Sequence, residues 1–245
     1  MKRMRSGENR RLGTVGIGVF GGTFNPIHRG HLHVAKSVQS LFGLSRVYFV
    51  VSAAPTHKPA DGLIPFAHRY AMTTLAVEKE ISLIPSMTEL DLEPSPYTID
   101  TMNKLVRVEK QNRLFFIAGG DSLLEVASWR ESDRLLAGYN FIFVTRPWDG
   151  RIDFEKCLSK EAFRRTRDLT GLDRASAKKK IAEEPEEENR IYIVDVKAPD
   201  ISSTKIRTLV AAEGRTRDVR RMLPPAVREY IRKLRLYSEA CNGCS

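Results

Sequence analysis

The stretch Phe20-Gly21-Gly22-Thr23-Phe24-Asn25-Pro26-Ile27-His28-Arg29-Gly30-His31-Leu32 joins two segments with different residue patterns. Before it, residues 14–20 combine β-branched and apolar side chains as a buried strand does, and after it residues 30–41 have helical periodicity. A strand, a glycine turn and a helix in this order predict the first βα unit of an open α/β sheet. Ligands bind beyond the carboxyl ends of the strands in such sheets, so this junction is the first candidate for a functional site.

The rest of the chain continues the alternation of short apolar runs and amphipathic segments. We expect buried strands at 46–51, 113–118, 139–145 and 190–196, and short extended segments at 81–84 and 87–92. We expect helices at 65–80 and 99–109, one or two short helices within 122–136, and a closing helix at 224–236. This alternation predicts an α/β fold: a Rossmann-like doubly wound parallel sheet with helices on both faces, in a single domain.

The composition is that of a globular protein, and its charge is unevenly placed. The 245 residues carry a formal net charge of +10, with 42% hydrophobic and 29% charged residues, which excludes a wholly disordered chain. Residues 1–11 hold five basic residues and one acidic residue, residues 190–245 hold twelve and six, and the stretch between them is balanced. A basic excess favours an anionic partner, although a solvated basic surface without a partner explains it equally well.

The charge pattern also suggests how the chain is organised. We expect a basic, flexible N-terminal tail at 1–11, one folded domain at 12–237 and a short C-terminal tail at 238–245. Within the domain, residues 150–189 hold ten basic and ten acidic residues. Such a density predicts a charged insertion, helical and partly mobile, that does not belong to the core.

The sequence argues against a membrane or secreted protein. Its apolar runs are shorter than the roughly 18 residues of a membrane span, and no apolar stretch follows the basic N-terminus. Three cysteines cannot build a disulfide framework, which favours the cytoplasm. We interpret the pair Cys241 and Cys244 as part of the tail, because the sequence shows no partners for a metal or redox site.

The junction after the first strand has the chemistry of an anion site. Glycines allow a close approach of the backbone, and the helix N-terminus adds free N–H groups and partial positive charge. His28 and His31 are three residues apart, so they share one helix face and can donate to a phosphate. The alternatives are histidines that only cap the helix, or a zinc site with His33, for which a nearby cysteine or carboxylate is missing.

A second motif, Ile201-Ser202-Ser203-Thr204-Lys205-Ile206-Arg207, has the pattern of a capped helix start. With a helix beginning at Thr204, Arg207 lies in its first turn, where hydroxyls, backbone N–H groups and the guanidinium suit a polyphosphate. An ordinary capped helix with a solvated arginine is the alternative.

Both motifs resemble those of a known family. The first resembles the signature of the α/β nucleotidylyltransferases, with Asn25 where most members have Asp, and the second resembles the signature of their adenylyltransferase branches, which implies ATP rather than CTP. The resemblance implies an ATP site made of residues from three parts of the chain: Gly21, Gly22, Thr23, Phe24, Gly30, His31, Gly119, Asp121, Ser203, Thr204 and Arg207. It implies that charge on the reacting phosphates is stabilised by His28, His31, Lys58 and Arg207.

Three further stretches resemble the nicotinate-nucleotide adenylyltransferases: Pro55-Thr56-His57-Lys58, the segment 94–101 and the segment 116–123 followed by Trp129. They depart from that branch at Thr56 and Pro96. The resemblance implies a nicotinate-nucleotide site formed by Asn25, His57, Lys58, Tyr97, Thr98 and Trp129. The assignment is physically reasonable, since an indole can stack on a pyridine ring and a helix entry can bind a carboxylate. A core tryptophan and a capping threonine are the alternatives.

The resemblance implies adenylyl transfer from ATP to nicotinate mononucleotide, which gives nicotinate adenine dinucleotide and pyrophosphate. Mg²⁺ is expected with the ATP phosphates, without a dedicated protein metal site. Nicotinamide mononucleotide and phosphopantetheine are alternative acceptors. A basic nucleic-acid-binding protein is a remote alternative, because a recognition motif for nucleic acid is missing from the sequence. We expect neither a nucleic-acid nor a membrane partner, and the sequence leaves the oligomeric state open.

Overall fold

A computed structural model describes residues 15–54, 62–92, 96–145, 153–212 and 216–238. The terminal tails expected at 1–11 and 238–245 lie outside these residues except for Ser238, as do His57, Lys58 and the CxxC pair.

A seven-stranded parallel sheet forms the centre of the described chain, in the order β3-β2-β1-β4-β5-β7-β6. The strands are β1 (Gly16–Gly22), β2 (Arg46–Val51), β3 (Leu83–Ser86), β4 (Arg113–Gly119), β5 (Asn140–Thr145), β6 (Thr166–Asp168) and β7 (Ile191–Asp195). From β1 the sheet continues through β2 and β3 on one side and through β4, β5, β7 and β6 on the other. This arrangement confirms the predicted Rossmann-like, doubly wound sheet.

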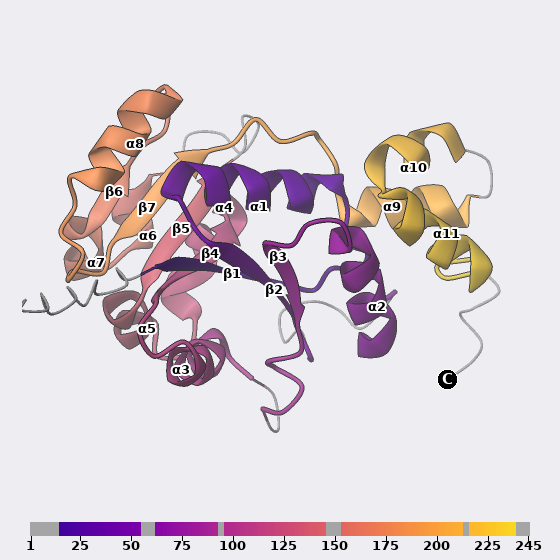
Figure 1. Cartoon of the computed structure of the whole chain (residues 1–245), viewed down its shortest axis with the longest axis horizontal. Coiled ribbons are helices and arrows are strands. Elements are labelled where there is room, and N and C mark those ends of the chain that lie inside the picture. The colour runs from indigo at the N-terminus through magenta and orange to yellow at the C-terminus, as the bar shows by residue number, and fades with distance from the viewer. Residues whose placement is uncertain (1–14, 55–61, 93–95, 146–152, 213–215, 239–245) are drawn as a thin grey trace, which may run out of the picture.

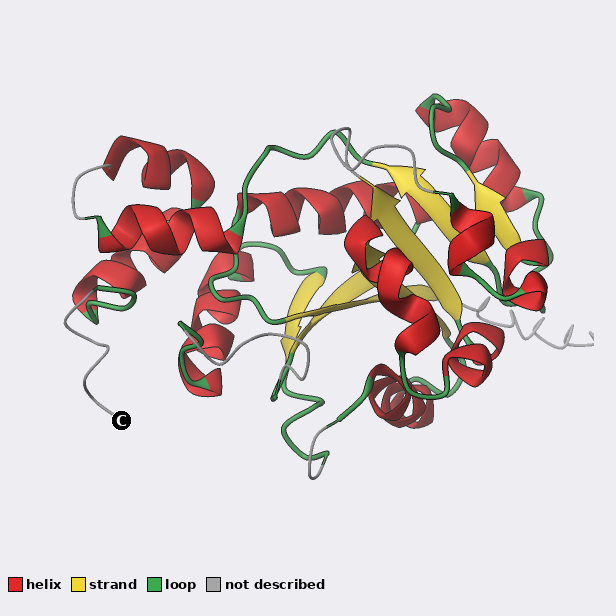
Figure 2. Ribbon diagram, turned by 180° about the vertical axis from the view of Figure 1, so that it is seen from behind, coloured by secondary structure: helices red, strands yellow, loops and turns green. Residues whose placement is uncertain are grey.

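Helices cover both faces of this sheet (Figures 1 and 2). One layer contains α1 (Arg29–Phe42), α2 (Phe66–Val77) and α8 (Arg174–Ala182), and the other contains α3 (Thr98–Val108), α4 (Gly120–Glu125), η1 (Val126–Ser128), α5 (Ser132–Gly138) and α7 (Lys160–Arg164). The short helix α6 (Phe154–Cys157) precedes α7. Side chains that alternate along each strand separate the two cores: Ile17 and Val19 pack into one, Phe20 into the other.

Close packing of the first strand explains one of its glycines. A Cβ at Gly18 would lie 2.9 Å from the Ile117 side chain and 3.0 Å from that of Val47. The side chains of the two neighbouring strands therefore occupy the space that a larger residue would need.

Three C-terminal helices form a group beside α2. They are α9 (Ser203–Ala211), α10 (Thr216–Met222) and α11 (Pro225–Lys233). The segment after β7 crosses the molecule to reach them, and they lie at the end opposite α8 (Figure 1). This crossing brings the second motif, far along the chain, next to the first. The closing helix expected at 224–236 is confirmed as α11.

Two sequence expectations are wrong. Residues 87–92 form turns rather than an extended segment, and the apolar side chains that suggested a strand, Met87 and Leu90, are 48% and 49% exposed. The charged insertion does contribute to the core: β6 pairs with β7 at the edge of the sheet, and Leu169 and Ala177 are buried.

Ion pairs explain how so charged a segment joins the core. Glu184 accepts hydrogen bonds from both Arg167 on β6 and Arg190 at the start of β7, the latter at 2.5 Å. Pairing of this kind offsets part of the desolvation cost of burying charged side chains.

Candidate active site

The strand order changes direction at β1 and β4, because the chain passes from β1 to β2 and β3 on one side and then returns to β4 on the other. β1 pairs with β2 on one side and with β4 on the other. At the carboxyl ends of these two strands lie Gly21 and Gly22 on one and Gly119 on the other. This is the position where open α/β sheets bind their ligands.

Close contacts shape the turn after β1. A Cβ at Gly22 would lie 2.8 Å from the Phe24 ring, and a Cβ at Gly21 would lie 3.0 Å from the ring of Phe116. Phe24 has a φ of 48° and is 2% exposed, with its ring edge-on to the His31 ring at 5.1 Å. Because that ring is buried, a contact between Phe24 and a ligand would have to come from its main chain.

The two motif histidines meet at the start of α1, as their spacing predicts. Their rings stack with centroids 3.7 Å apart. His28 is the N-cap residue of the helix and is buried, and its backbone N–H donates to Nδ1 of His31 at 3.2 Å. Because Nδ1 of His31 accepts this bond, its proton in the neutral ring lies on Nε2, which can donate to an anion.

Asn25 is a buried connection between separate segments. Its Nδ2 donates to the carbonyl of Gly62 at 2.8 Å, and its Oδ1 accepts from the hydroxyl of Tyr237 at 2.8 Å. The guanidinium of Arg207 donates to its backbone oxygen at 2.9 Å. Both Nδ2 and Oδ1 of Asn25 are therefore hydrogen-bonded within the protein, whereas the family resemblance places this residue in the nicotinate-nucleotide site.

The second motif reaches the first through these contacts. Ser203 donates to the carbonyl of Pro26 at 2.9 Å, and Arg207 bonds to Asn25 across 182 residues. The helix begins one residue earlier than predicted, because Ser202 acts as N-cap and accepts from the backbone of Lys205 at 3.1 Å. Nη2 of Arg207 also lies 3.4 Å from the hydroxyl of Thr204, whereas the hydroxyls of Ser202 and Ser203 bond to the backbone of Lys205 and Pro26.

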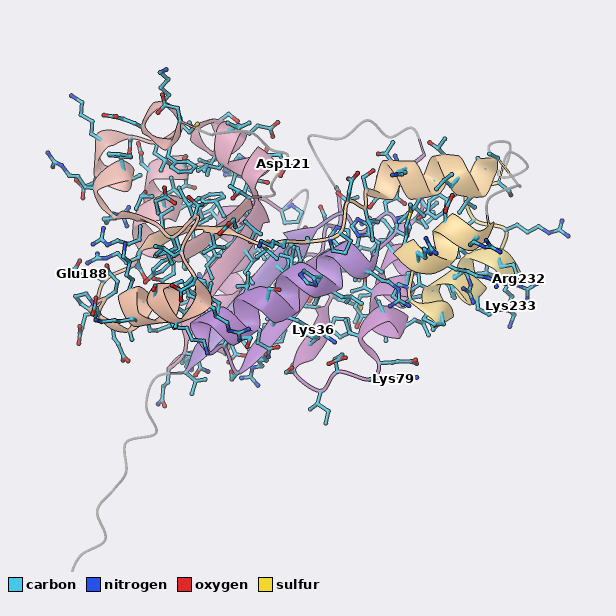
Figure 3. All side chains as sticks on the ribbon, turned by 90° about the horizontal axis from the view of Figure 1, so that it is seen from above. Lys36, Lys79, Asp121, Glu188, Arg232 and Lys233 are labelled. Atoms are coloured by element: carbon cyan, nitrogen blue, oxygen red, sulfur yellow. The ribbon has the colours of Figure 1, made fainter. Side chains whose placement is uncertain are left out.

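Asp121 lies at the end of β4, in the first turn of α4, and is labelled in Figure 3. Its Oδ1 accepts from the backbone of Ser122 at 3.0 Å, and the side chain is exposed. A Cβ at Gly119 would lie only 2.3 Å from that oxygen. Glycine at this position is therefore what allows the carboxylate to fold back over the strand end.

Tyr97 and Trp129 lie on the side of the sheet that α3 covers. Tyr97 is the N-cap of α3 and its backbone donates to Asp100 at 3.1 Å, while Thr98 begins the helix. The ring of Trp129 packs edge-on against Phe116 at 6.1 Å. Arg130 lies over the ring of Tyr97 at 4.9 Å, so these two parts of the predicted nucleotide site are neighbours.

Two charged residues, Arg69 buried and Glu89 partly buried, support the site although the sequence patterns did not reveal them. Arg69 on α2 is 1% exposed and donates to the carbonyls of Thr23, Ser52 and Ile64 at 2.9, 2.7 and 3.1 Å. Glu89 accepts from the backbone of Ala53 at 3.1 Å and from Thr101 at 3.0 Å. Burial lowers the pKa of Arg69 and raises that of Glu89. In the sequence, the only indication of this role is that Arg69 lies among apolar residues of the helix expected at 65–80.

Among the residues that the structure describes, no three or more His, Cys, Asp or Glu side chains are grouped so that they could hold a metal ion. In that same part of the chain, every helix is too short or too polar to cross a membrane.

Known proteins resemble this chain over most of its length. Residues 19–209 match the family model described as cytidylyltransferase-like. A probable nicotinate-nucleotide adenylyltransferase of Thermoanaerobacter sp. (strain X514) is 37% identical over 91% of this chain and 94% of its own length. A protein of the same description from Geobacter sp. (strain M21) is 34% identical over 91% and 99%.

Solved structures resemble it in fold. Plasmodium falciparum nicotinic acid mononucleotide adenylyltransferase complexed with NaAD aligns with a TM-score of 0.66 and 20% identity, covering 91% of this chain and 97% of that one.

Proposed function

The chain belongs to the nicotinate-nucleotide adenylyltransferases within the cytidylyltransferase-like family, and we propose on this premise that it transfers the adenylyl group of ATP to nicotinate mononucleotide. The products are nicotinate adenine dinucleotide and pyrophosphate, a step of NAD biosynthesis. The observation that carries the proposal is the contact between the two motifs, where Arg207 on α9 bonds to the turn that holds His28 and His31.

The reaction needs positioning and charge stabilisation rather than a nucleophile on the protein. The 5′-phosphate of the mononucleotide attacks the α-phosphorus of ATP, and the bond to the pyrophosphate leaving group breaks. Negative charge on the transferring group must be stabilised by fixed donors. In our proposal Nε2 of His31 and the guanidinium of Arg207 supply two of them, with His28 orienting His31 through the bond to Nδ1.

The remaining assignments rest on the family resemblance. Lys58 and His57, which lie outside the described residues, would bind the mononucleotide. The backbone of Gly21, Gly22, Thr23 and Gly30 would face the ATP phosphates, and Asp121 would accept its ribose hydroxyls. Trp129 and the Tyr97-Thr98 helix entry would hold the nicotinate ring and its carboxylate.

We expect Mg²⁺ to arrive with ATP. This agrees with the lack of a group of three or more His, Cys, Asp or Glu side chains among the described residues, since the phosphates themselves provide hard oxygen ligands. The ion would neutralise phosphate charge, while the protein groups hold the nucleotides in line. A cytoplasmic location also stays a prediction, based on the few cysteines.

A pyrophosphate-release assay that crosses two donors with three acceptors tests the function. ATP and CTP are each combined with nicotinate mononucleotide, nicotinamide mononucleotide and phosphopantetheine. We expect rapid release only for ATP with nicotinate mononucleotide, and the dinucleotide product in equal amount. Equal or better use of the amide nucleotide would contradict carboxylate recognition, and release with phosphopantetheine alone would contradict the proposed acceptor.

A further inference from the structure

Tyr237 follows the last helix and lies far from both motifs in the sequence, yet its hydroxyl reaches the turn after β1. The hydroxyl lies 2.8 Å from Oδ1 of Asn25, across 212 residues. The backbone takes positive φ at Arg235 (51°) and again at Tyr237 (64°), while Leu236 between them is buried. Non-glycine residues rarely adopt this region, so the surrounding contacts must favour the placement of the Tyr237 side chain.

The direction of the bond follows from the other partners of the amide. Nδ2 of Asn25 donates to the carbonyl of Gly62 at 2.8 Å, which places Oδ1 toward Tyr237. Burial raises the pKa of the Tyr237 phenol, although the charges of Arg207 and Arg69 act to lower it. The phenol therefore stays protonated and donates to Asn25.

Asn25, which accepts the hydrogen bond from Tyr237, also contacts two other parts of the site. Its backbone oxygen accepts from Arg207 at 2.9 Å, and its Nδ2 donates to the carbonyl of Gly62, the first described residue after the segment 55–61. Gly62 has a φ of 71°, and a Cβ there would lie 3.6 Å from Nε of Arg207. Gly62, Asn25 and Arg207 thus pack as one unit.

We propose that Tyr237 is a positioning residue for adenylyl transfer: through Asn25 it holds the guanidinium of Arg207 and the backbone of Gly62 in place. The proposal rests on the function proposed above. It also gives a reason for Asn at position 25, because an aspartate could accept from Tyr237 but could not donate to the carbonyl of Gly62.

Tyr237→Phe tests the proposal, because it keeps the buried ring and removes only the hydroxyl. Tyr230→Phe is the matched control: Tyr230 lies on α11, and its hydroxyl bonds to His68 at 3.0 Å rather than to the turn after β1. We expect Tyr237→Phe to lower kcat about tenfold with a smaller change in the KM for ATP, since Arg207 acts on charge in the transition state. Tyr230→Phe should stay within about twofold of the wild type, with both melting temperatures similar.

A double-mutant cycle shows whether the effect passes through Asn25. In an Asn25→Ala background, Tyr237→Phe should change kcat by less than about twofold, because its acceptor is already gone. A full tenfold loss in that background would overturn the proposal. So would a Tyr237→Phe kcat within twofold of the wild type, or an equal loss in Tyr230→Phe.

The wild-type control separates this test from the test of function. If the wild type uses a different pair of nucleotides, the proposed function fails, and the same variants are then compared on the pair that it does use.

Discussion

His31 is the residue on which the chemistry most depends. Its Nδ1 accepts the backbone N–H of His28, and stacking on the His28 ring holds it in place. A fixed donor of this kind stabilises developing charge without reorganisation during the reaction. The same bond forms part of the capping box of α1, so the ring caps the helix and is held in one orientation by that contact.

Replacing His31 by alanine should lower kcat by about 100-fold or more while the fold survives, because a lost donor to transition-state charge costs about this much. Steady-state kinetics and circular dichroism measure the two effects. His33→Ala is the control, since His33 lies exposed on the same helix. Nearly full turnover in His31→Ala would show that the site is wrongly assigned.

Gly119 offers a second test at this scale. Alanine there would place its Cβ 2.3 Å from Oδ1 of Asp121, so the carboxylate must move. If Asp121 binds the ribose of ATP, the KM for ATP should rise about tenfold, in line with the loss of a hydrogen bond to a charged group. Gly138→Ala, where the added Cβ meets open space, should leave the KM unchanged. An unchanged KM in Gly119→Ala would remove Asp121 from the ATP site.

Residues close in sequence were easier to predict than residues brought together by folding. The spacing of His28 and His31 within one helix turn predicted their contact. The part that Tyr237 and Arg69 play depends on contacts with Asn25, Thr23 and Ser52, which come from other elements. Such contacts join residues that are far apart in the chain, and the residue spacing in a single sequence does not indicate them.

The same distinction holds for whole elements. The bounds of β2 and α1 were predicted closely. A strand that is buried on both faces needs a continuous apolar run, and a helix that packs on a sheet shows helical periodicity. The strand β6 was missed because Thr166-Arg167-Asp168 is short, polar and at the sheet edge. Backbone pairing with β7 and the ion pair between Arg167 and Glu184 hold it, and apolar periodicity detects neither.

That ion pairing can be tested through Glu184, whose side chain is 15% exposed. Burial acts to raise the pKa of Glu184, but hydrogen bonds from Arg167 and Arg190 outweigh it and the pKa falls below 4.5. Glu184→Gln should destabilise the protein by about 2 kcal/mol near neutral pH, because Arg167 loses its charged partner and Arg190 keeps only its ion pair with Glu188. Urea unfolding measures the loss, with exposed Glu183→Gln as the control.

The pH dependence supplies a further check on Glu184. A pKa lowered by folding stabilises the folded state above the unfolded pKa and loses that effect as the pH falls through the folded value. The stability gap between wild type and Glu184→Gln should therefore narrow below about pH 4.5. A gap that stays constant from pH 7 down to the lowest pH at which both proteins still fold would mean that charge is not its cause.

At the scale of the whole molecule, the site lies where two parts of the protein meet. The sheet supplies the turn after β1 and the end of β4, and the group of α9, α10 and α11 supplies Arg207. Much of the basic excess lies elsewhere, as on the exposed side chains of α10, and Arg232 and Lys233 lie at the outer end of this group (Figure 3).

If that excess is solvated surface charge, removing part of it should leave catalysis intact. We expect a variant with Arg217, Arg220 and Arg221 all changed to Gln to keep kcat/KM within about twofold of the wild type, because exposed charges are screened over about 8 Å at physiological salt. Kinetics at low and physiological ionic strength, with a mobility-shift titration on RNA and DNA, measure the effect. A tenfold rise in the KM for ATP would mean that these charges steer the nucleotide to the site. Tight, salt-sensitive nucleic-acid binding that the variant loses would instead assign the surplus to a second partner.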